Sequence, residues 1–239
     1  MSKTYRGSAL PAVDNLSLEI RQGARYGLLG PNGAGKTTTI SILCGLLNYD
    51  HGSVFINGMK LESKFRKIRR QIGLVPQDIA LYESLTAWEN LRFIAGMYGL
   101  KGREMKNRIE ECLDMVGLAQ NGHKQIGKYS GGMKRRINLA AGILHNPEIL
   151  VLDEPTTGVD VQSRNTILDF LRQVNQKGTT IIYTSHYLEE AEQLCDEITI
   201  IDNGKVIIEG KTGEIIGQNK AYADLESVFL HLTGRRLRD

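Results

Sequence analysis

A glycine-rich loop between an apolar run and a helical pattern is the feature that most constrains how this chain can fold. The loop reads Gly30-Pro31-Asn32-Gly33-Ala34-Gly35-Lys36-Thr37 and follows the apolar residues 26–29. Glycines at this spacing let successive backbone amides turn toward one anion, and the N-terminus of the following helix adds a partial positive charge. Lys36 is expected to reach the terminal phosphates of a nucleotide, and the Thr37 hydroxyl to ligate magnesium. A strand, this loop and a helix in that order predict a phosphate-binding loop within an α/β fold.

Other short apolar runs predict a mainly parallel core sheet. Runs of this kind suit strands that are buried on both faces. They cover residues 26–29, 72–75, 149–152, 180–184 and 198–201. Helical patterns alternate with them, and one such pattern places four apolar residues on one face: Met133, Ile137, Ala140 and Leu144. The alternation of strands and helices predicts an α/β sheet.

Two regions depart from this pattern. Residues 16–20 alternate between apolar and polar, and residues 53–56 run into the turn Asn57-Gly58. Both features predict half-exposed antiparallel strands, which form an antiparallel β part. Residues 78–128 have helical spacing and little strand character, which predicts a helical insertion.

The chain is expected to form one domain, residues 1–239, because it has no internal repeat, low-complexity tract or linker. Its core, with the antiparallel β part, is expected over residues 1–77 and 146–239, and its helical subdomain over residues 78–145. Near the end, a hairpin is predicted around Asn203-Gly204. An amphipathic helix follows it, with one apolar face made of Leu225, Val228, Phe229 and Leu232.

Composition excludes several classes of protein. Thirty Lys and Arg residues stand against 27 Asp and Glu residues, so the net charge of +3 gives no electrostatic reason to expect a nucleic acid partner. The three cysteines, Cys44, Cys112 and Cys195, are too far apart for a zinc site and too few for a disulfide framework. We therefore expect a reducing compartment. We also expect a chain that is soluble by itself, because no apolar run has the roughly 18 residues of a membrane span.

A pair of carboxylates follows one of the predicted parallel strands. Asp153 and Glu154 come directly after residues 149–152, at the strand end where ligands bind in open α/β sheets. Asp153 is expected to hold magnesium, and Glu154 to orient the attacking water or accept its proton. The alternative interpretation is an acidic helix cap before Pro155.

Three further motifs complete a pattern that resembles a known family. Tyr129-Ser130-Gly131-Gly132-Met133 precedes a helix, Gln77 follows one predicted strand, and His186 follows another. In order with the phosphate loop and Asp153-Glu154, they make nearly the whole chain resemble the nucleotide-binding subunit of an ABC transporter. The resemblance implies a P-loop NTPase of ABC type. In that family, the Ser-Gly-Gly signature of one subunit closes on the γ-phosphate held by the other, so that a head-to-tail dimer sandwiches two ATP molecules.

The resemblance assigns roles to individual residues. The candidate catalytic residues are Glu154, His186 and Gln77. The candidate magnesium ligands are Thr37, Gln77 and Asp153. The candidate ATP-binding residues are Tyr5, Gly30, Pro31, Asn32, Gly33, Ala34, Gly35, Lys36, Thr37, Thr38, Ser130, Gly131, Gly132 and Asp160. By themselves, Gln77 also fits a polar strand end, His186 an ordinary surface or core histidine, and Asp160 a helix N-cap.

The sequence departs from the family pattern in two places. Tyr129 and Met133 stand where the family commonly has Leu and Gln. Because Ser130 and both glycines remain, phosphate contact is expected to survive, with a different hydrolysis rate. Only residues 1–4 precede Tyr5, where the family has a further strand before the aromatic residue that stacks on adenine. We therefore expect a shortened or misassigned start.

The resemblance implies an ATP-hydrolysing subunit that drives a separately encoded transmembrane permease from the cytoplasmic face of the membrane. The second ATPase is another copy or a paralogue, and the permease selects the cargo. Residues 225–234 resemble the ending of ATPases from ABC-2 type drug-resistance exporters, and no regulatory domain follows them, so export is expected. The alternatives are an ABC ATPase that acts on nucleic acid or the ribosome, and a module that binds nucleotide without turnover.

The cations among residues 64–70 are interpreted as a solvated helix face rather than a surface for nucleic acid or lipid.

Overall fold

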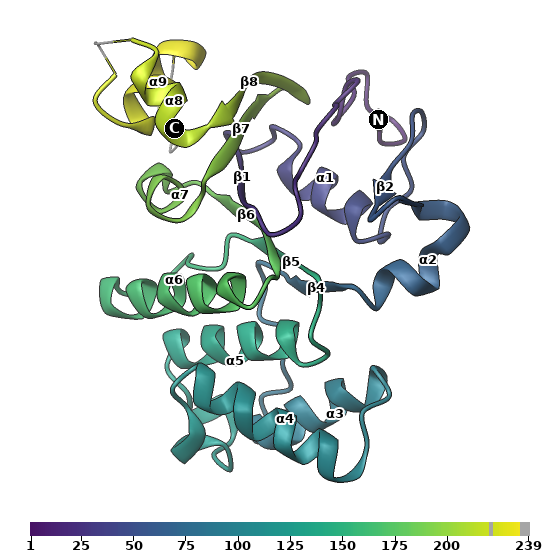
Figure 1. Ribbon diagram of the computed structural model, residues 1–239, viewed down its shortest axis with the longest axis vertical. Helices are drawn as coiled ribbons and strands as arrows, with labels where there is room; N and C mark the ends of the chain where they lie inside the picture. Colours follow the sequence, from purple (N-terminus) through teal and green to yellow (C-terminus); the bar gives the residue numbers. More distant parts are fainter. Residues whose placement is uncertain (220–221, 235–239) are drawn as a thin grey trace. The chain divides into compact units, whose positions relative to one another are not determined.

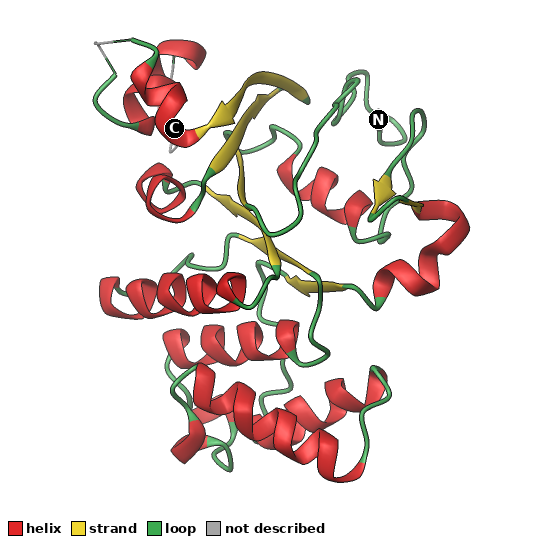
Figure 2. Ribbon diagram, viewed as in Figure 1, coloured by secondary structure: helices red, strands yellow, loops and turns green. Residues whose placement is uncertain are grey.

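Two units make up the part of the chain described by the computed structural model, residues 1–219 and 222–234. The first unit comprises Met1–Arg69 and Thr180–Asp239, and the second comprises Arg70–Thr179. Figures 1 and 2 show the elements of each unit. The helical segment predicted over residues 78–145 lies within the second unit, together with two strands and a further helix.

The sheet of the first unit has three parallel strands and one antiparallel strand. Its strands are, in order across the sheet, β6 (Thr180–Ser185), β1 (Arg25–Leu29), β7 (Glu197–Asp202) and β8 (Lys205–Lys211). β1 is parallel to both of its neighbours and is almost fully buried, as its unbroken apolar run predicts. β7 and β8 form the predicted hairpin, whose turn residues Asn203 and Gly204 both have positive φ.

A short hairpin forms the antiparallel β part of the first unit. Its strands are β2 (Phe55–Ile56) and β3 (Met59–Lys60). Asn57 and Gly58 join them with φ values of 49° and 71°. Two successive residues with positive φ are typical of a type I′ turn, which Asn-Gly favours. The sequence therefore predicted this hairpin correctly.

The prediction of a strand over residues 16–20 is wrong. Burial alternates as expected, with Leu16 buried and Ser17 exposed, but the segment belongs to no strand. Leu16 exchanges hydrogen bonds with Met1, whose ammonium group donates to the Leu16 carbonyl at 2.6 Å. Alternating apolar and polar residues indicate which side chains face the core. A strand also needs a partner strand that continues the pattern of backbone hydrogen bonds.

Two residues before Tyr5 pair with other parts of the first unit. Ser2 pairs with His51, and Lys3 pairs with Val13, as isolated antiparallel bridges. The amide of Ala12 also donates to the Lys3 carbonyl at 2.8 Å. These bonds fix the backbone that leads into Tyr5.

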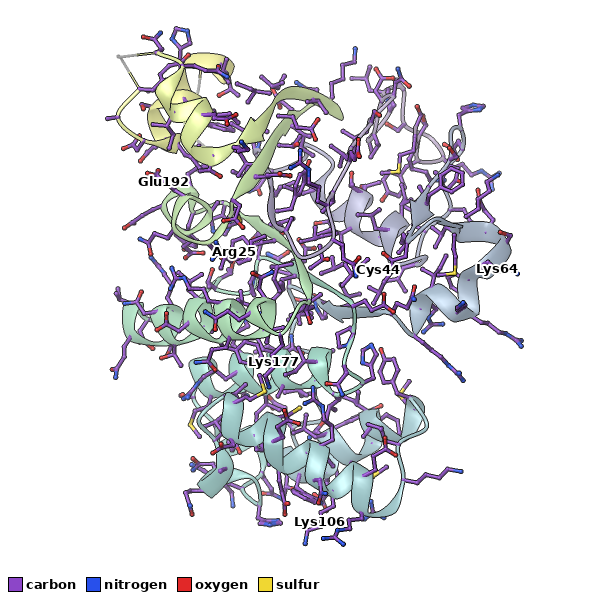
Figure 3. The ribbon with its side chains drawn as sticks, in the orientation of Figure 1. Arg25, Cys44, Lys64, Lys106, Lys177 and Glu192 are labelled. Atoms are coloured by element: carbon purple, nitrogen blue, oxygen red, sulfur yellow. The ribbon has the colours of Figure 1, made fainter. Side chains whose placement is uncertain are left out.

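Five helices complete the part of the first unit that the structure describes. They are α1 (Lys36–Leu43), α2 (Leu61–Arg69), α7 (Leu188–Leu194), α8 (Thr212–Gly217) and α9 (Leu225–Thr233). The predicted face of α9 buries Leu225, Val228 and Phe229, whereas Leu232 is 36% exposed. Glu192, labelled on α7 in Figure 3, accepts a hydrogen bond from the Leu225 amide at 3.0 Å. α9 is therefore anchored on α7 by a hydrogen bond as well as by its apolar face.

The cations of α2 lie on an exposed surface. Lys64, Arg66, Lys67 and Arg69 are all exposed, whereas Ile68 is buried. The helix is interrupted at Lys64, which has φ −126° and ψ 24° and is labelled in Figure 3. The charged side chains of α2 therefore face away from the residues that Ile68 packs against.

The second unit joins two parallel strands to a group of helices. Its strands are β4 (Ile72–Val75) and β5 (Ile149–Asp153), and Ile72 lies opposite Ile149. Its helices are α3 (Ala87–Met97), α4 (Gly102–Met115), α5 (Gly131–Ile143) and α6 (Val161–Gln176), with short 3₁₀ turns at Ala119–Asn121 and Ile126–Lys128. α3, α4 and α5 pack together (Figure 1), so residues 78–128 have the helical character that their spacing predicts. No helix in the described ranges is long and apolar enough to cross a membrane.

The close packing of α5 on β4 depends on Gly73. A Cβ atom at this position would lie 2.1 Å from the Gly142 carbonyl oxygen of α5. No side chain fits at that distance, so the helix and the strand approach one another through glycine. This packing brings α5 close to the strand that leads into Gln77.

All three cysteines are buried and carry free thiols. Burial raises the pKa of Cys112 to about 11, because an apolar environment disfavours the thiolate.

Candidate active site

The phosphate loop of the first unit has the backbone that an anion-binding loop requires. It leaves β1 at Leu29 and enters α1 at Lys36. Gly33 and Gly35 have φ values of 80° and 102°, in the left-handed region that glycine tolerates. A Cβ atom on Gly35 would also lie 2.3 Å from the Ala12 carbonyl oxygen. Because Gly35 occupies the N-cap of α1 and has no side chain, no side-chain cap competes with an anion for the first amides of the helix.

Lys36 lies over this loop. Its ammonium group donates to the carbonyl oxygens of Gly30 at 2.7 Å and Pro31 at 3.1 Å, and the residue is only 5% exposed. These hydrogen bonds hold the positive charge against the loop, where a bound phosphate would take the place of the carbonyl oxygens. The predicted electrostatic role of Lys36 therefore has a suitable geometry.

Tyr5 lies at the start of α1. Its hydroxyl forms a hydrogen bond with Thr38 Oγ1 at 3.2 Å, although 33 residues separate the two in the chain. Tyr5 remains 47% exposed, so its ring offers a surface on which a base can stack. The structure thus brings together two of the predicted ATP-binding residues.

The turn between β7 and β8 supports the phosphate loop, which the sequence alone did not indicate. The Gly204 amide donates to the Ala34 carbonyl oxygen at 3.1 Å, and the Gly204 carbonyl oxygen accepts from the Asp14 amide at 2.9 Å. A Cβ atom on Gly204 would lie 2.9 Å from the Ala12 carbonyl oxygen. The Asn-Gly pair was recognisable as a turn, but its contact with the loop depends on the fold.

His186 leaves the same sheet edge as the phosphate loop. β1 and β6 are parallel, with Leu29 opposite Ser185. Gly30 directly follows Leu29, and His186 directly follows Ser185. The His186 ring lies against the Tyr187 ring, with centroids 4.4 Å apart. Parallel strands direct their C-terminal ends to one edge, which is where ligands bind in α/β sheets. The register therefore places the candidate catalytic residue His186 at the edge that carries the loop.

A buried carboxylate orders the backbone around His186. Glu190 is 1% exposed and accepts hydrogen bonds from the Tyr183 hydroxyl at 2.5 Å and the Ser185 hydroxyl at 3.2 Å. Ser185 Oγ in turn accepts from the Tyr187 amide at 2.8 Å. This network fixes both residues that flank His186, and the sequence patterns did not single it out.

In the second unit, Gln77 and Glu154 come together. β4 and β5 are parallel with Val75 opposite Leu152, so both segments leave the same edge of the strand pair. Gln77 Nε2 donates to Glu154 Oε2 at 3.1 Å. The same carboxylate oxygen accepts from Thr157 Oγ1 at 3.3 Å. Asp153 and Glu154 are 5% and 7% exposed, so two carboxylates lie nearly buried at the strand end.

The backbone at Glu154 is strained. Its φ of 48° places it in the left-handed region, which residues other than glycine, asparagine and aspartate rarely adopt. Such a conformation costs on the order of 1–3 kcal/mol and persists only where surrounding contacts fix it. Strain of this kind clusters at functional sites.

The helix-cap alternative for Asp153-Glu154 is excluded, because α6 begins only at Val161 and has Asp160 as its N-cap.

The signature residues lie at the N-terminus of α5. Ser130 is the N-cap, and its hydroxyl accepts from the Met133 amide at 3.3 Å. Gly131 faces open space, whereas a Cβ atom on Gly132 would lie 2.5 Å from Ser163 Oγ. Ser163 also donates to Asp160 through its amide and its hydroxyl, both at 2.8 Å. Ser163 thus packs closely against Gly132 and forms hydrogen bonds with Asp160.

Asp160 is held in its charged form. The hydrogen bond from the Ser163 amide, followed by that from the Ser163 hydroxyl, lowers the pKa of Asp160 below its usual value. A charged aspartate at the N-cap satisfies the first amides of α6 and interacts favourably with the helix dipole. The predicted N-cap role of Asp160 is confirmed.

The departure at Tyr129 is accommodated inside the second unit. Tyr129 is 6% exposed, and its hydroxyl donates to the Asn121 carbonyl oxygen at 2.7 Å. The larger side chain therefore buries its ring and satisfies its polar atom while Ser130 stays exposed.

Arg135 is the main residue near the site that sequence reasoning missed. It is 6% exposed within α5 and donates to the Gln77 carbonyl oxygen at 2.6 Å. An arginine in a helix is ordinarily a surface residue, and nothing in its spacing distinguished it from Lys134 or Arg136.

Comparisons with known proteins agree with this geometry. The ABC transporter family profile matches residues 13–157. The linearmycin resistance ATP-binding protein LnrL of Bacillus subtilis (strain 168) is 51% identical over 198 residues, which cover 83% of this chain and 64% of that protein. The chain therefore spans less than two thirds of that relative.

Two solved structures are similar over most of the chain. An ATP-binding subunit of an ABC transporter has a TM-score of 0.86 and 31% identity, and the match covers 97% of this chain and 96% of that chain. A dimeric post-hydrolysis state of the ATP-binding cassette MJ0796, bound to ADP and Pi, has a TM-score of 0.80 and 30% identity, covering 88% and 95%. The mainly parallel α/β fold, the phosphate loop and these matches together show that the chain belongs to the ABC transporter family, as an ATP-binding cassette of the P-loop type.

Proposed function

We propose that this chain is the ATP-binding and ATP-hydrolysing subunit of an ABC exporter and that it drives a separately encoded transmembrane permease. The observation that carries the proposal is Glu154, which is strained, nearly buried and held by Gln77 in a chain that also has a complete phosphate loop. A module that only binds nucleotide has no need for a positioned carboxylate of this kind.

Nucleotide binding is assigned to the first unit. The loop from Gly30 to Thr38 surrounds the phosphates with its backbone amides, except at Pro31, which has no N–H group. Lys36 neutralises the terminal phosphates, and Tyr5 stacks on the adenine. The position of Tyr5 against Thr38 supports this assignment. The ammonium group of Lys36 already lies on the loop carbonyls, so ATP binding requires little rearrangement of that side chain.

Magnesium is assigned to Thr37, Gln77 and Asp153. Among the described residues there is no group of three or more histidine, cysteine, aspartate or glutamate side chains able to hold a metal. This fits Mg²⁺, which usually binds one or two protein side chains together with substrate phosphates and water. When bound, the ion would neutralise charge on the β- and γ-phosphates.

Hydrolysis is assigned to three side chains. Glu154 accepts the proton of the attacking water or orients that water toward the γ-phosphate. Gln77 holds Glu154 and contacts the water, and His186 donates a hydrogen bond to the γ-phosphate. The hydrogen bond between Gln77 and Glu154 supports their joint action.

A second ATPase subunit completes each site in this proposal. Ser130, Gly131 and Gly132 of one copy cover the γ-phosphate bound by the other, and Asp160 contacts the opposite copy. The exposed Ser130 and the open space at Gly131 leave this helix end accessible to a partner. The similar MJ0796 cassette is described as a dimer, which supports the arrangement. Complete motifs on both faces of this chain allow a homodimer.

An apolar surface on the second unit supports a protein partner there. It consists of Tyr82, Phe93, Met97 and Tyr98, with exposed fractions of 57%, 52%, 71% and 37%. Tyr82 and Phe93 stack edge to face, with ring centroids 5.7 Å apart. Exposed apolar and aromatic residues on a helix and on the segments beside it are typical of an interaction site. We assign this surface, on α3 and the segment before it, to the cytoplasmic loops of the permease.

Export is proposed because of similarity to LnrL, which is named for linearmycin resistance. A resistance function fits the removal of a compound from the cell. The chain is accordingly assigned to the cytoplasmic face of the membrane, where it is held through its permease.

The test is to purify the tagged chain from native membranes in mild detergent, with and without Phe93→Asp. We expect the wild-type chain to retain a multi-spanning membrane protein, and Phe93→Asp to lower that retention about tenfold or more, because a buried aspartate at an interface costs at least 1.4 kcal/mol. Mass spectrometry of the purified complex measures the retention.

Phe55→Asp is the matched control, because Phe55 is 61% exposed but lies on β2 in the other unit. It is expected to retain the membrane protein at the wild-type level. Recovery of the wild-type chain with ribosomes or nucleic acid, and without any membrane protein, would contradict the proposal in favour of the non-transport alternative.

A further inference from the structure

A buried arginine links the signature helix to the residues that hold Glu154. Arg135 lies on α5, five residues after the N-cap Ser130. Its guanidinium group donates to the carbonyl oxygens of Gln77 at 2.6 Å, Thr157 at 3.3 Å and Pro76 at 3.5 Å. One side chain therefore fixes two backbone segments that are 58 and 22 residues away from it in the sequence.

Both of these segments lead to the same carboxylate oxygen. The Gln77 side chain donates to Glu154 Oε2 at 3.1 Å, and the Thr157 hydroxyl donates to that oxygen at 3.3 Å. Arg135 holds the main chain of each donor, and each donor holds Glu154. A strained backbone such as that of Glu154 needs contacts of this kind to persist.

The environment of Arg135 argues against a purely stabilising role. The residue is 6% exposed, and its Nε atom has no hydrogen-bond partner among the described residues. Burial lowers the pKa of Arg135, with smaller opposing effects from Asp78 and Glu154. A buried cation whose hydrogen bonds go to carbonyl groups costs more free energy than an apolar side chain in the same space. A positioning role accounts for this cost.

We propose that Arg135 is a positioning residue for ATP hydrolysis: it sets the Gln77 and Thr157 backbones so that both side chains hold Glu154, and it ties this arrangement to the helix that carries Ser130. The inference rests on the proposed ATPase function and extends it. When the α5 N-terminus meets a nucleotide on the partner copy, the position of α5 is transmitted through Arg135 to Glu154.

The experiment compares steady-state ATP hydrolysis by the purified full chain, wild type and Arg135→Gln. We expect kcat to fall about 10- to 100-fold, because a small displacement of a catalytic group has an effect of this size. The KM for ATP and the affinity for a fluorescent ATP analogue are expected to stay within about twofold of wild type, because the residues assigned to ATP binding in the first unit are unchanged.

Arg108→Gln is the matched control. Arg108 donates to the carbonyl oxygens of Leu144 at 3.0 Å and Ile143 at 2.5 Å, at the other end of α5. Like Arg135, it donates to backbone carbonyls, but it extends from α4 to the end of α5 and lies away from Gln77. Its loss is expected to lower thermal stability while leaving kcat within about twofold of wild type.

A double variant separates positioning from general damage. In the Glu154→Gln background, Arg135→Gln is expected to lower the residual rate by less than about twofold, because residues that act through one another are not additive. If Arg135→Gln does not fold, Arg135→Lys provides the comparison, since lysine keeps the positive charge but lacks the planar fork of donors with which the guanidinium group reaches both backbone segments.

Three results would overturn the inference. The first is a wild-type kcat in folded Arg135→Gln, and the second is a rise in its KM for ATP as large as its fall in kcat. The third is a loss of rate in the double variant equal to the product of the two single losses. A wild-type chain that binds ATP without hydrolysing it would instead overturn the proposed function, and the Arg135 inference with it. The wild-type reaction in the same assay distinguishes these outcomes.

Discussion

Replacing Glu154 by Gln is expected to abolish most ATP turnover while leaving ATP binding intact, and to trap the chain as an ATP-bound dimer. An amide cannot accept a proton from the attacking water, and the loss of a general base lowers the rate about 10²- to 10⁴-fold. The amide oxygen of Gln can still accept from Gln77 and Thr157, so the local structure is expected to persist. The substitution also removes a negative charge near the γ-phosphate, which stabilises the closed state.

Light scattering with and without Mg-ATP measures the trapped state, and phosphate release measures the rate. We expect the mass of the variant to double with ATP. Glu148→Gln is a matched control at the other end of β5, because Glu148 accepts from Gln71 Nε2 at 2.8 Å much as Glu154 accepts from Gln77. It is expected to turn over ATP at the wild-type rate. Normal turnover by Glu154→Gln would refute the assignment of the base.

Replacing Ser130 by Asp is expected to spare the ATP affinity of the isolated chain and to remove hydrolysis. Aspartate caps a helix as well as serine does, so α5 is expected to keep its N-terminus. Its carboxylate would face the γ-phosphate of the partner's nucleotide. Like charges about 4 Å apart repel by about 4 kcal/mol at an effective dielectric constant near 20, which corresponds to roughly a thousandfold loss of rate.

Ser130→Asn separates charge from shape, because asparagine also caps helices and is neutral. Its turnover is expected to lie well above that of Ser130→Asp. ATP affinity, measured by fluorescence of a labelled analogue, is expected to match wild type in both variants. Undiminished hydrolysis by Ser130→Asp would show that the signature does not contribute to the site.

Features with local causes were predictable from the sequence. The phosphate loop depends on glycine spacing within eight residues, and the caps at Ser130 and Asp160 bond to amides only three residues further on. The buried parallel strands were also predictable, because strands covered on both faces need unbroken apolar runs. The failed strand at residues 16–20 shows the limit of this reasoning, since alternation cannot reveal whether a partner strand exists.

Features that depend on distant contacts were not predictable. Gln77 and Glu154 are 77 residues apart, and their hydrogen bond exists only because β4 and β5 pair in one register. The left-handed backbone at Glu154 follows from its surroundings rather than from its residue type. Arg135 looked like its neighbours in sequence, and only the fold turns it toward Gln77. The roles of these residues in hydrolysis remain proposals that the variants above test.

The most direct test of the shared active site mixes two inactive variants, Lys36→Ala and Ser130→Asp. If each site takes its phosphate loop from one copy and its signature from the other, every mixed dimer has one complete site. An equal mixture is then expected to recover about a quarter of the wild-type rate, because about half of the dimers are mixed and each has one of its two sites intact. A mixture no more active than either variant alone, under conditions where the wild-type chain hydrolyses ATP, would contradict the account.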